Sequence, residues 1–209
     1  MLIRLATTED GPALARIYAP AVVDCITSFE SEPPDGAEMG RRVERLADRT
    51  PWLVCEHSGD VIGYAYASPH RERFAYQWSV EVSAYVDAGF HRAGVARALY
   101  TSLFAILALQ GFRNSYAGIT LPNPASVGLH QALGFTPVGV YRDIGYKLGA
   151  WHDVVWLERA LAPRVTDPAN PRPLSEVRDS DAFRDALTSG LRAIELRPAS
   201  PGTRDRSHD

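Results

Sequence analysis

The stretch W-S-V-E-V-S-A-Y-V-D-A-G-F-H-R-A-G-V-A, residues 78–96, decides how the rest of this chain is organised. Its first half, up to Val86, is rich in β-branched and aromatic residues, which favours a strand. After Gly94 apolar residues recur at helical spacing, which predicts a helix. The chain must therefore turn sharply at 91–94. The backbone N–H groups that point out of the new helix N-terminus would stabilise an anionic phosphate.

The composition indicates an ordinary globular protein that acts on small molecules. A chain of 209 residues can bury one sizeable core and carry an appendage, and its net charge of −3 gives no bulk attraction for nucleic acid. No apolar run approaches the roughly 20 residues that span a bilayer, and the N-terminus lacks the apolar core of a signal peptide. Cys25 and Cys55 have no ligand-like spacing, so we expect reduced thiols in or near the core and no metal site. These features predict a cytoplasmic location, without nucleic acid or membrane as a partner.

The pattern along the chain predicts the element order β-α-α-β-β-β-α-β-α-β-β, a mixed α/β sheet with helices on its faces. Helices are expected after residues 8–10 and after Asp35, Gly94 and Asn123, because these positions carry capping or turn residues. Residues 142–149 are expected to connect the last two strands. The expected strands are 2–6, 52–56, 61–67, 78–86, 116–120, 135–141 and 150–157.

The composition shifts after residue 161, which divides a domain, 1–161, from a proline-rich linker and charged tail, 162–209. A partly disordered tail is the expectation for so polar a segment. Within it, Phe183, Leu187, Leu191 and Ile194 recur at a spacing that permits one amphipathic helix. The alternative is therefore that this helix docks on the domain or on a second subunit.

Four sequence blocks carry a resemblance to a known family. H-R-A-G-V-A, residues 91–96, resembles the pattern Q/R-x-x-G-x-G/A of the GNAT acyl-CoA N-acyltransferase superfamily, with His91 where Gln or Arg is usual, and the likeness covers roughly residues 2–160. W-S-V-E-V-S-A-Y-V, L-P-N-P-A-S-V-G-L-H-Q-A-L-G-F and G-Y-K-L-G-A-W-H-D-V are similar to segments of phosphinothricin N-acetyltransferases and their methionine sulfoximine or sulfone relatives. The resemblance implies a mostly antiparallel GNAT-type sheet and a homodimer. It also implies acetyl-CoA as donor and the α-amino group of a small amino-acid-like compound as acceptor. In that family, such acetylation detoxifies inhibitors of glutamine synthetase.

The resemblance also implies which residues bind the donor. Backbone amides around Gly94 would hold the pyrophosphate, whatever side chain stands at His91. Asn123 is fully explained as a helix N-cap, and the family likeness adds a contact to the pantetheine arm by it or by Ser126. The expected donor-binding residues are Val82, Ala84, Val86, His91, Arg92, Ala93, Gly94, Val95, Ala96, Asn123 and Ser126.

Acetyl transfer to an amine needs a base, because an ammonium group must lose a proton before it attacks a thioester. Glu81 is the first candidate, since it lies in a strand of apolar and small residues and matches the family's proposed catalytic glutamate. The alternative for Glu81 is a salt bridge with Arg71 or Arg73. His130, on the helix face of Asn123, is the second candidate as base or proton shuttle. It is equally well explained as a hydrogen-bonded or solvated helix residue.

A cation with directional donors suits an acceptor carboxylate, which favours arginine. Lys147, Trp151, His152 and Asp153 match the family without a role that the sequence explains. A peptide N-terminus or polyamine as acceptor, and a non-catalytic acyl-CoA-binding module, are the competing functions. The expected acceptor-binding residues are Ser28, Phe29, Arg71, Arg73 and Tyr76.

Overall fold

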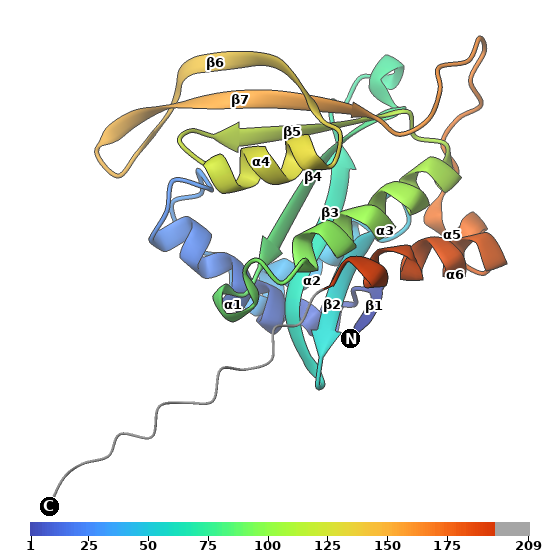
Figure 1. Cartoon of the computed structure of the whole chain (residues 1–209), viewed down its shortest axis with the longest axis horizontal. Helices are drawn as coiled ribbons and strands as arrows, with labels where there is room; N and C mark the ends of the chain where they lie inside the picture. Colours follow the sequence, from blue (N-terminus) through green and yellow to red (C-terminus); the bar gives the residue numbers. More distant parts are fainter. Residues whose placement is uncertain (195–209) are drawn as a thin grey trace, which may run out of the picture.

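A computed structural model of the chain describes residues 1–194, which form a seven-stranded sheet flanked by helices (Figure 1). The strand order is β1-β2-β3-β4-β5-β7-β6, and every neighbouring pair is antiparallel except β4 and β5. This confirms the mixed, mostly antiparallel α/β fold. The strands are β1 (Leu2–Leu5), β2 (Trp52–His57), β3 (Asp60–Pro69), β4 (Ser79–Val86), β5 (Asn114–Thr120), β6 (Thr136–Lys147) and β7 (Ala150–Ala160). The helices are α1 (Gly11–Val23), α2 (Gly36–Leu46), α3 (Val95–Gln110), α4 (Pro124–Ala132), α5 (Leu174–Val177) and α6 (Asp181–Thr188).

The two faces of the sheet carry separate hydrophobic clusters. Helices α1 and α2 pack on one face, against Trp52, Val54 and Tyr64. Helices α3 and α4 cover the other face, where Val80 and Val82 of β4 are buried. Because successive side chains of a strand point to opposite faces, Glu81 lies on the α1 and α2 side.

The expected helix ends are present with the expected side chains. The Asp35 carboxylate accepts a hydrogen bond from the Glu38 amide (2.7 Å), and the Asn123 side chain accepts one from the Ser126 amide (3.0 Å). Helix α3 ends at Gly111, whose φ of +100° lies in the left-handed region. Local capping chemistry therefore predicts where α2, α3 and α4 begin or end.

The expected connection at 142–149 is wrong, because β6 continues to Lys147. Asp143 takes a positive φ of +48° at an irregularity between Tyr141 and Gly145, and pairing with β7 resumes after it. A bulge absorbs the extra residues, so the strand bends without ending. The turn itself contains only Leu148 and Gly149, both with positive φ.

The described part of the C-terminal segment packs along α3. Leu174, Val177, Phe183 and Ala186 are buried in the cluster that α3 helps to form. The Ser102 hydroxyl of α3 donates to the Leu187 carbonyl (2.7 Å), so helix α6 is fastened to α3. The predicted helix is thus present in part as α6, and Figure 1 shows α5 and α6 beside α3. The boundary at residue 161 stays a prediction, and tail residues 195–209 lie outside the described residues.

Both cysteines carry free thiols, but they differ in burial. Cys55 is buried in β2 as expected, whereas Cys25 is exposed because it follows the end of α1 in a surface loop. In residues 1–194 no helix has the length and apolar character needed to cross a membrane.

Candidate active site

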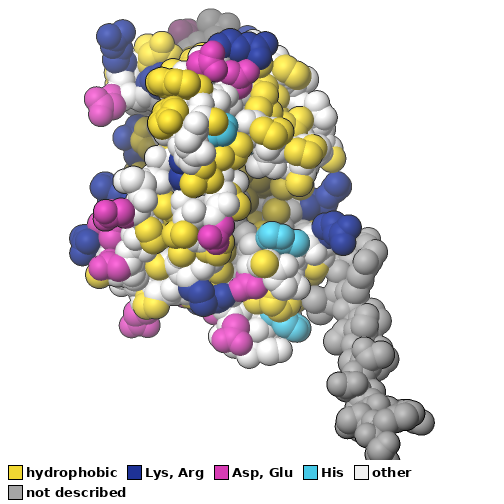
Figure 2. All heavy atoms as spheres, turned by 90° about the vertical axis from the view of Figure 1, so that its left-hand side faces the viewer, with side chains coloured by type: hydrophobic (Ala, Val, Ile, Leu, Met, Phe, Trp, Pro, Cys, Tyr) yellow, Lys and Arg dark blue, Asp and Glu magenta, His cyan; other side chains and the backbone are white. Residues whose placement is uncertain are grey.

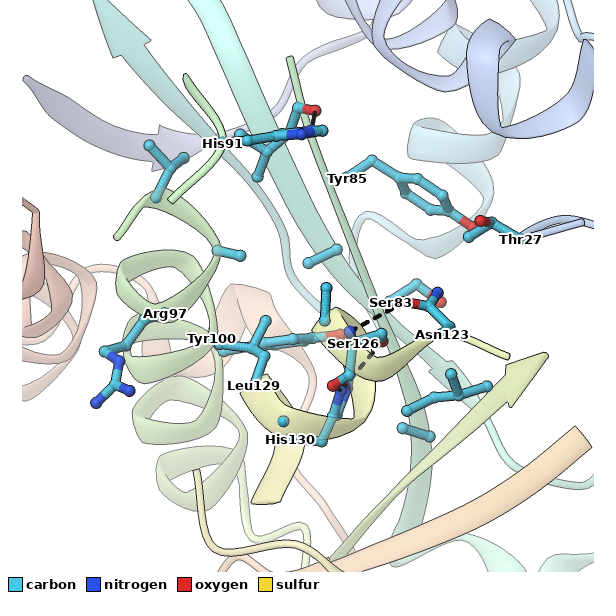
Figure 3. Close-up of a pocket in the computed structure, with 18 of the residues that line it drawn as sticks. Thr27, Ser83, Tyr85, His91, Arg97, Tyr100, Asn123, Ser126, Leu129 and His130 are labelled. Atoms are coloured by element: carbon cyan, nitrogen blue, oxygen red, sulfur yellow. Dashed lines mark hydrogen bonds between the residues drawn. The ribbon is translucent and has the colours of Figure 1, made fainter. Parts of the chain in front are cut away.

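The central feature of the site is the point at which β4 and β5 separate. The two strands are in parallel register from the pair Ser79 and Asn114 to the pair Glu81 and Tyr116. Beyond that pair a cavity of about 830 Å³ opens, and its wall begins with the next residues, Val82 on β4 and Ala117 on β5. Both faces of β4 contribute, since no partner strand covers this edge. The cavity therefore reaches from the α3 and α4 side to Thr27 in the loop after α1 (Figure 3).

The expected donor-binding residues lie around this cavity, except Ala93. Arg92 and Gly94 take positive φ values of +62° and +81° and turn the chain into α3. The first N–H groups of α3 have no acceptor within the helix, and no other described residue accepts a hydrogen bond from them. His91 makes a hydrogen bond between its Nε2 and the Val86 carbonyl oxygen (2.9 Å), which fastens the turn to the end of β4. The expected residues that line the cavity are Val82, Ala84, Val86, His91, Arg92, Gly94, Val95, Ala96, Asn123 and Ser126.

His130 forms part of the cavity wall on α4 with one ring nitrogen unused. Its Nδ1–H donates to the Ser126 carbonyl oxygen (2.8 Å), so Nε2 carries the lone pair. Nε2 is buried and has no partner among the described residues. Burial lowers the pKa of His130, which outweighs the opposing hydrogen bond to Ser126. His130 is therefore a neutral imidazole whose Nε2 can accept a proton. Figure 3 shows the ring beside Tyr100 and Ser126.

Glu81 lies next to the cavity on the opposite side of β4 from Val82, and 33% of its side chain is exposed. Its partner is His70, whose Nδ1 is 3.0 Å from Glu81 Oε1. The alternative of an ion pair with Arg71 or Arg73 is not present within residues 1–194. His70 was not expected from the sequence; it lies two residues after Ser68, which the pairing of β3 with β4 brings opposite Glu81.

The residues expected to bind the acceptor are spread over two segments. Arg71 and Arg73 are exposed, and Tyr76 lies beside His70 with ring centroids 6.1 Å apart. Phe29 packs closely against Gly145 of β6. Ser28 is only 7% exposed, and its hydroxyl is engaged by the Tyr18 hydroxyl (2.7 Å) and the Glu30 amide (3.1 Å). Thr27, rather than Ser28, reaches the cavity wall.

The loop after α1 is held at both ends. Glu30 accepts two hydrogen bonds from Arg42 of α2 (2.8 and 3.0 Å), which lower the pKa of the Glu30 carboxyl. The Lys147 ammonium donates to the carbonyl oxygens of Val22 (2.6 Å) and Ser28 (2.5 Å). Lys147, a family match without a role in the sequence, therefore ties the β6–β7 turn to this loop.

Other cavity residues were not expected from the sequence. One signal in the sequence could have placed β5 at the cavity. A strand, a helix and a second strand in succession favour a crossover that brings the second strand beside the first, as β4, α3 and β5 do. Figure 2 shows hydrophobic side chains gathered around a recess, with Lys and Arg side chains at one rim. In the described ranges no three His, Cys, Asp or Glu side chains are grouped as metal ligands would be. The missed lining residues are Thr27, Ser83, Tyr85, Phe90, Arg97, Tyr100, Ala117, Gly118, Ile119, Thr120, Ala125, Gly128, Leu129 and Ala132.

Comparison with known proteins gives consistent matches that each cover most of the chain. A family model described as an acetyltransferase (GNAT) domain matches residues 3–156. Phosphinothricin N-acetyltransferase of Streptomyces viridochromogenes is 43% identical over 84% of this chain and 93% of its own. L-methionine sulfoximine/L-methionine sulfone acetyltransferase of Salmonella typhimurium is 32% identical over 77% and 95%. The crystal structure of a GNAT superfamily phosphinothricin acetyltransferase from Sinorhizobium meliloti in complex with acetyl-CoA superimposes with a TM-score of 0.76, at 35% identity, over 80% and 92%.

Proposed function

Since the chain belongs to the GNAT acetyltransferase family, we propose that it transfers the acetyl group of acetyl-CoA to the α-amino group of a small amino-acid-like acceptor. Acceptors of the phosphinothricin, methionine sulfoximine and methionine sulfone type are the first choice, because similar proteins acetylate these compounds. Their acetylation would be a detoxification. The observation that carries the proposal is the opening between β4 and β5, which has a carboxylate at its vertex and a glycine turn on its rim.

The cavity fits acetyl-CoA, which supplies the thioester when bound. Its volume lies in the range of ordinary small-ligand sites, and β4 and β5 offer it mainly small and apolar side chains. The unpaired N–H groups at the start of α3 suit a pyrophosphate, because the helix dipole adds to their hydrogen bonds. Asn123 and Ser126 on α4 are the proposed contacts of the pantetheine arm. No metal has a role in this proposal.

Glu81 acts as the general base, taking a proton from the acceptor ammonium directly or through a water molecule. Its position one residue before the first cavity residue of β4 supports this role. His130 is the second candidate, because this residue lines the cavity and its buried Nε2 carries a lone pair that no described residue uses. The free amine then attacks the thioester carbon without a covalent enzyme intermediate. The C–S bond breaks, and the departing CoA thiolate takes up the proton that the new amide nitrogen loses.

The acceptor side lies between the segment after β3 and the loop after α1. Arg71 and Arg73 bind the acceptor carboxylate, and exposed guanidinium groups without an ion-pair partner in the described residues are available for it. Tyr76 packs near His70 and bounds the same side. Phe29, with Ser28 holding the loop from beneath, closes the other side.

The protein forms a homodimer in the cytoplasm. Strand β6 is the edge of the sheet, and the β6–β7 hairpin exposes large apolar side chains, including Ile144, Tyr146, Leu148 and Trp151. An unpaired edge with so much apolar surface is suited to a second copy. Sedimentation equilibrium should give twice the chain mass, and Trp151→Lys should shift it toward a single chain.

A thiol-release assay with acetyl-CoA tests the activity. Phosphinothricin, methionine sulfoximine and methionine sulfone should release CoA well above the rate without an acceptor. An N-terminal peptide and a polyamine serve as competing acceptors, and faster turnover with either would replace the proposed substrate class. Calorimetric binding of acetyl-CoA without release for any acceptor would indicate a binding module instead.

A further inference from the structure

His70 is held in one orientation by aromatic rings on several sides. Its ring stacks on Tyr116 of β5, with centroids 4.5 Å apart and an interplanar angle of 22°. Trp156 of β7 and Tyr76 contact the ring at steep angles, with centroids 6.0 and 6.1 Å away. The His70 amide also donates to the Ser79 carbonyl oxygen (3.3 Å), which fixes the backbone against β4. Only 15% of the side chain is exposed, so both the ring and its attachment are constrained.

This orientation directs Nδ1 at the carboxylate of Glu81. The distance from Nδ1 to Oε1 is 3.0 Å, and an ionised carboxylate only accepts hydrogen bonds, so Nδ1 carries the hydrogen. The neighbouring Tyr116 does not compete as an anion, since burial, with Glu158 nearby, raises its pKa. Among the described residues, Oε2 of Glu81 has no hydrogen-bond partner, so it is the oxygen left to face a substrate.

We propose that His70 is a positioning residue for the reaction, an inference that rests on the proposed role of Glu81 as base. A carboxylate on a flexible side chain has several rotamers, and only one of them directs its lone pair along the path of proton transfer. The hydrogen bond from Nδ1 selects one rotamer, while Tyr116 and Trp156 hold the imidazole. The vertex of the cleft therefore contains a pair, Glu81 and His70, of which only Glu81 meets the acceptor.

Two substitutions separate the hydrogen bond from the packing. His70→Phe keeps a flat ring against Tyr116 and removes the donor. His70→Asn keeps an N–H donor near the position of Nδ1 and removes most of the ring. With the best acceptor of the thiol-release assay, His70→Phe should lower kcat about 10- to 100-fold, with the KM for acetyl-CoA within twofold of wild type. His70→Asn should recover a large part of that loss.

The double variant with Glu81→Gln shows whether His70 acts through Glu81. In the Glu81→Gln background, the change His70→Phe should have almost no further effect on kcat, because the base that it positions is absent. A wild-type kcat in folded His70→Phe, or an equal loss in both backgrounds, overturns the inference. Unchanged turnover in Glu81→Gln instead overturns the base assignment itself. Thermal unfolding of each variant identifies any that fails to fold; if His70→Phe does, His70→Leu, which also lacks the donor, replaces it in both backgrounds.

Discussion

Glu81 and Tyr116 are the last parallel pair of β4 and β5, so the carboxylate stands where the sheet opens. The side chains of paired residues lie on the same face, and this face carries α1, α2 and the loop after α1. The turn at residues 91–94, which is proposed to bind the donor, lies on the rim of the same cavity at the start of α3. The fold thus separates the proposed base from the turn proposed to bind the donor's phosphate groups, while both lie at one opening.

Loss of the carboxylate should abolish most of the turnover. We expect Glu81→Ala to lower kcat roughly 10²- to 10⁴-fold at neutral pH, the usual contribution of a general base. Glu72→Ala, which removes an exposed carboxylate from the segment before β4, is the matched control and should retain wild-type turnover. Steady-state kinetics with the preferred acceptor measures both. A small loss that does not vary at higher pH would instead assign the base role to His130 or to water.

His130 should make the fold sensitive to mild acid. Its pKa is lowered by burial, so the unfolded chain binds a proton more readily than the folded chain. The stability is therefore complete above the unfolded pKa of about 6.5 and falls as the pH drops through that value toward the folded pKa.

His130→Asn keeps an N–H near Nδ1 for the Ser126 carbonyl and removes the titrating ring. Urea unfolding between pH 5 and 8 should show a smaller acid loss for this variant than for wild type. Equal acid losses would show that other groups cause the sensitivity. His91→Asn, at an exposed histidine, is the control and should retain the wild-type acid loss.

Lys147 should matter for the acceptor rather than for the donor. Its ammonium group holds the carbonyl oxygens of Val22 and Ser28, and charged hydrogen bonds of this kind contribute about 1.5–3 kcal/mol. Lys147→Met should raise the KM for the acceptor several-fold, because the loop after α1 loses its tie to the β6–β7 turn. The KM for acetyl-CoA should stay within about twofold. Arg142→Met, at an exposed position on β6, should change neither value.

Gly94 is a position at which a methyl group should not be tolerated. Its φ of +81° disfavours any L side chain, and a Cβ there would lie 2.1 Å from the Ala193 carbonyl oxygen. Gly94→Ala should raise the KM for acetyl-CoA and lower the free energy of unfolding by about 1–3 kcal/mol. Gly139→Ala, which has open space and an ordinary φ, is the control. A Gly94→Ala protein with unchanged donor affinity would contradict the role of this turn.

Local chemistry explains what could be predicted from the sequence. The caps at Asp35 and Asn123 and the glycine stop at Gly111 each depend on a few neighbouring residues. The turn at residues 91–94 was also predictable from neighbouring residues, because Gly94 and the helix after it determine where the backbone N–H groups point. These signals sufficed for the element order, but for fewer than half of the residues that line the cavity.

The rest depends on contacts between distant parts of the chain. His70 was missed because its link to Glu81 arises from the β3–β4 pairing and from Tyr116 and Trp156 on other strands. Ser28 was expected to face the acceptor, yet Tyr18 of α1 engages its hydroxyl. Residues 142–149 were expected to connect two strands, whereas pairing with β7 continues β6 past a bulge. None of these outcomes has a local sequence signal.

The C-terminal segment has a practical consequence for handling the protein. It runs along α3 from Arg172, whose amide donates to the Gln110 carbonyl oxygen (2.7 Å), to Ala193, which lies against Gly94. A fusion partner joined directly after Ile194 would therefore begin beside the turn that is proposed to bind the donor. Met1 precedes β1, the edge strand at the other end of the sheet order from β6. Tags for kinetic work belong at the N-terminus, and a reporter of donor binding belongs at the C-terminus.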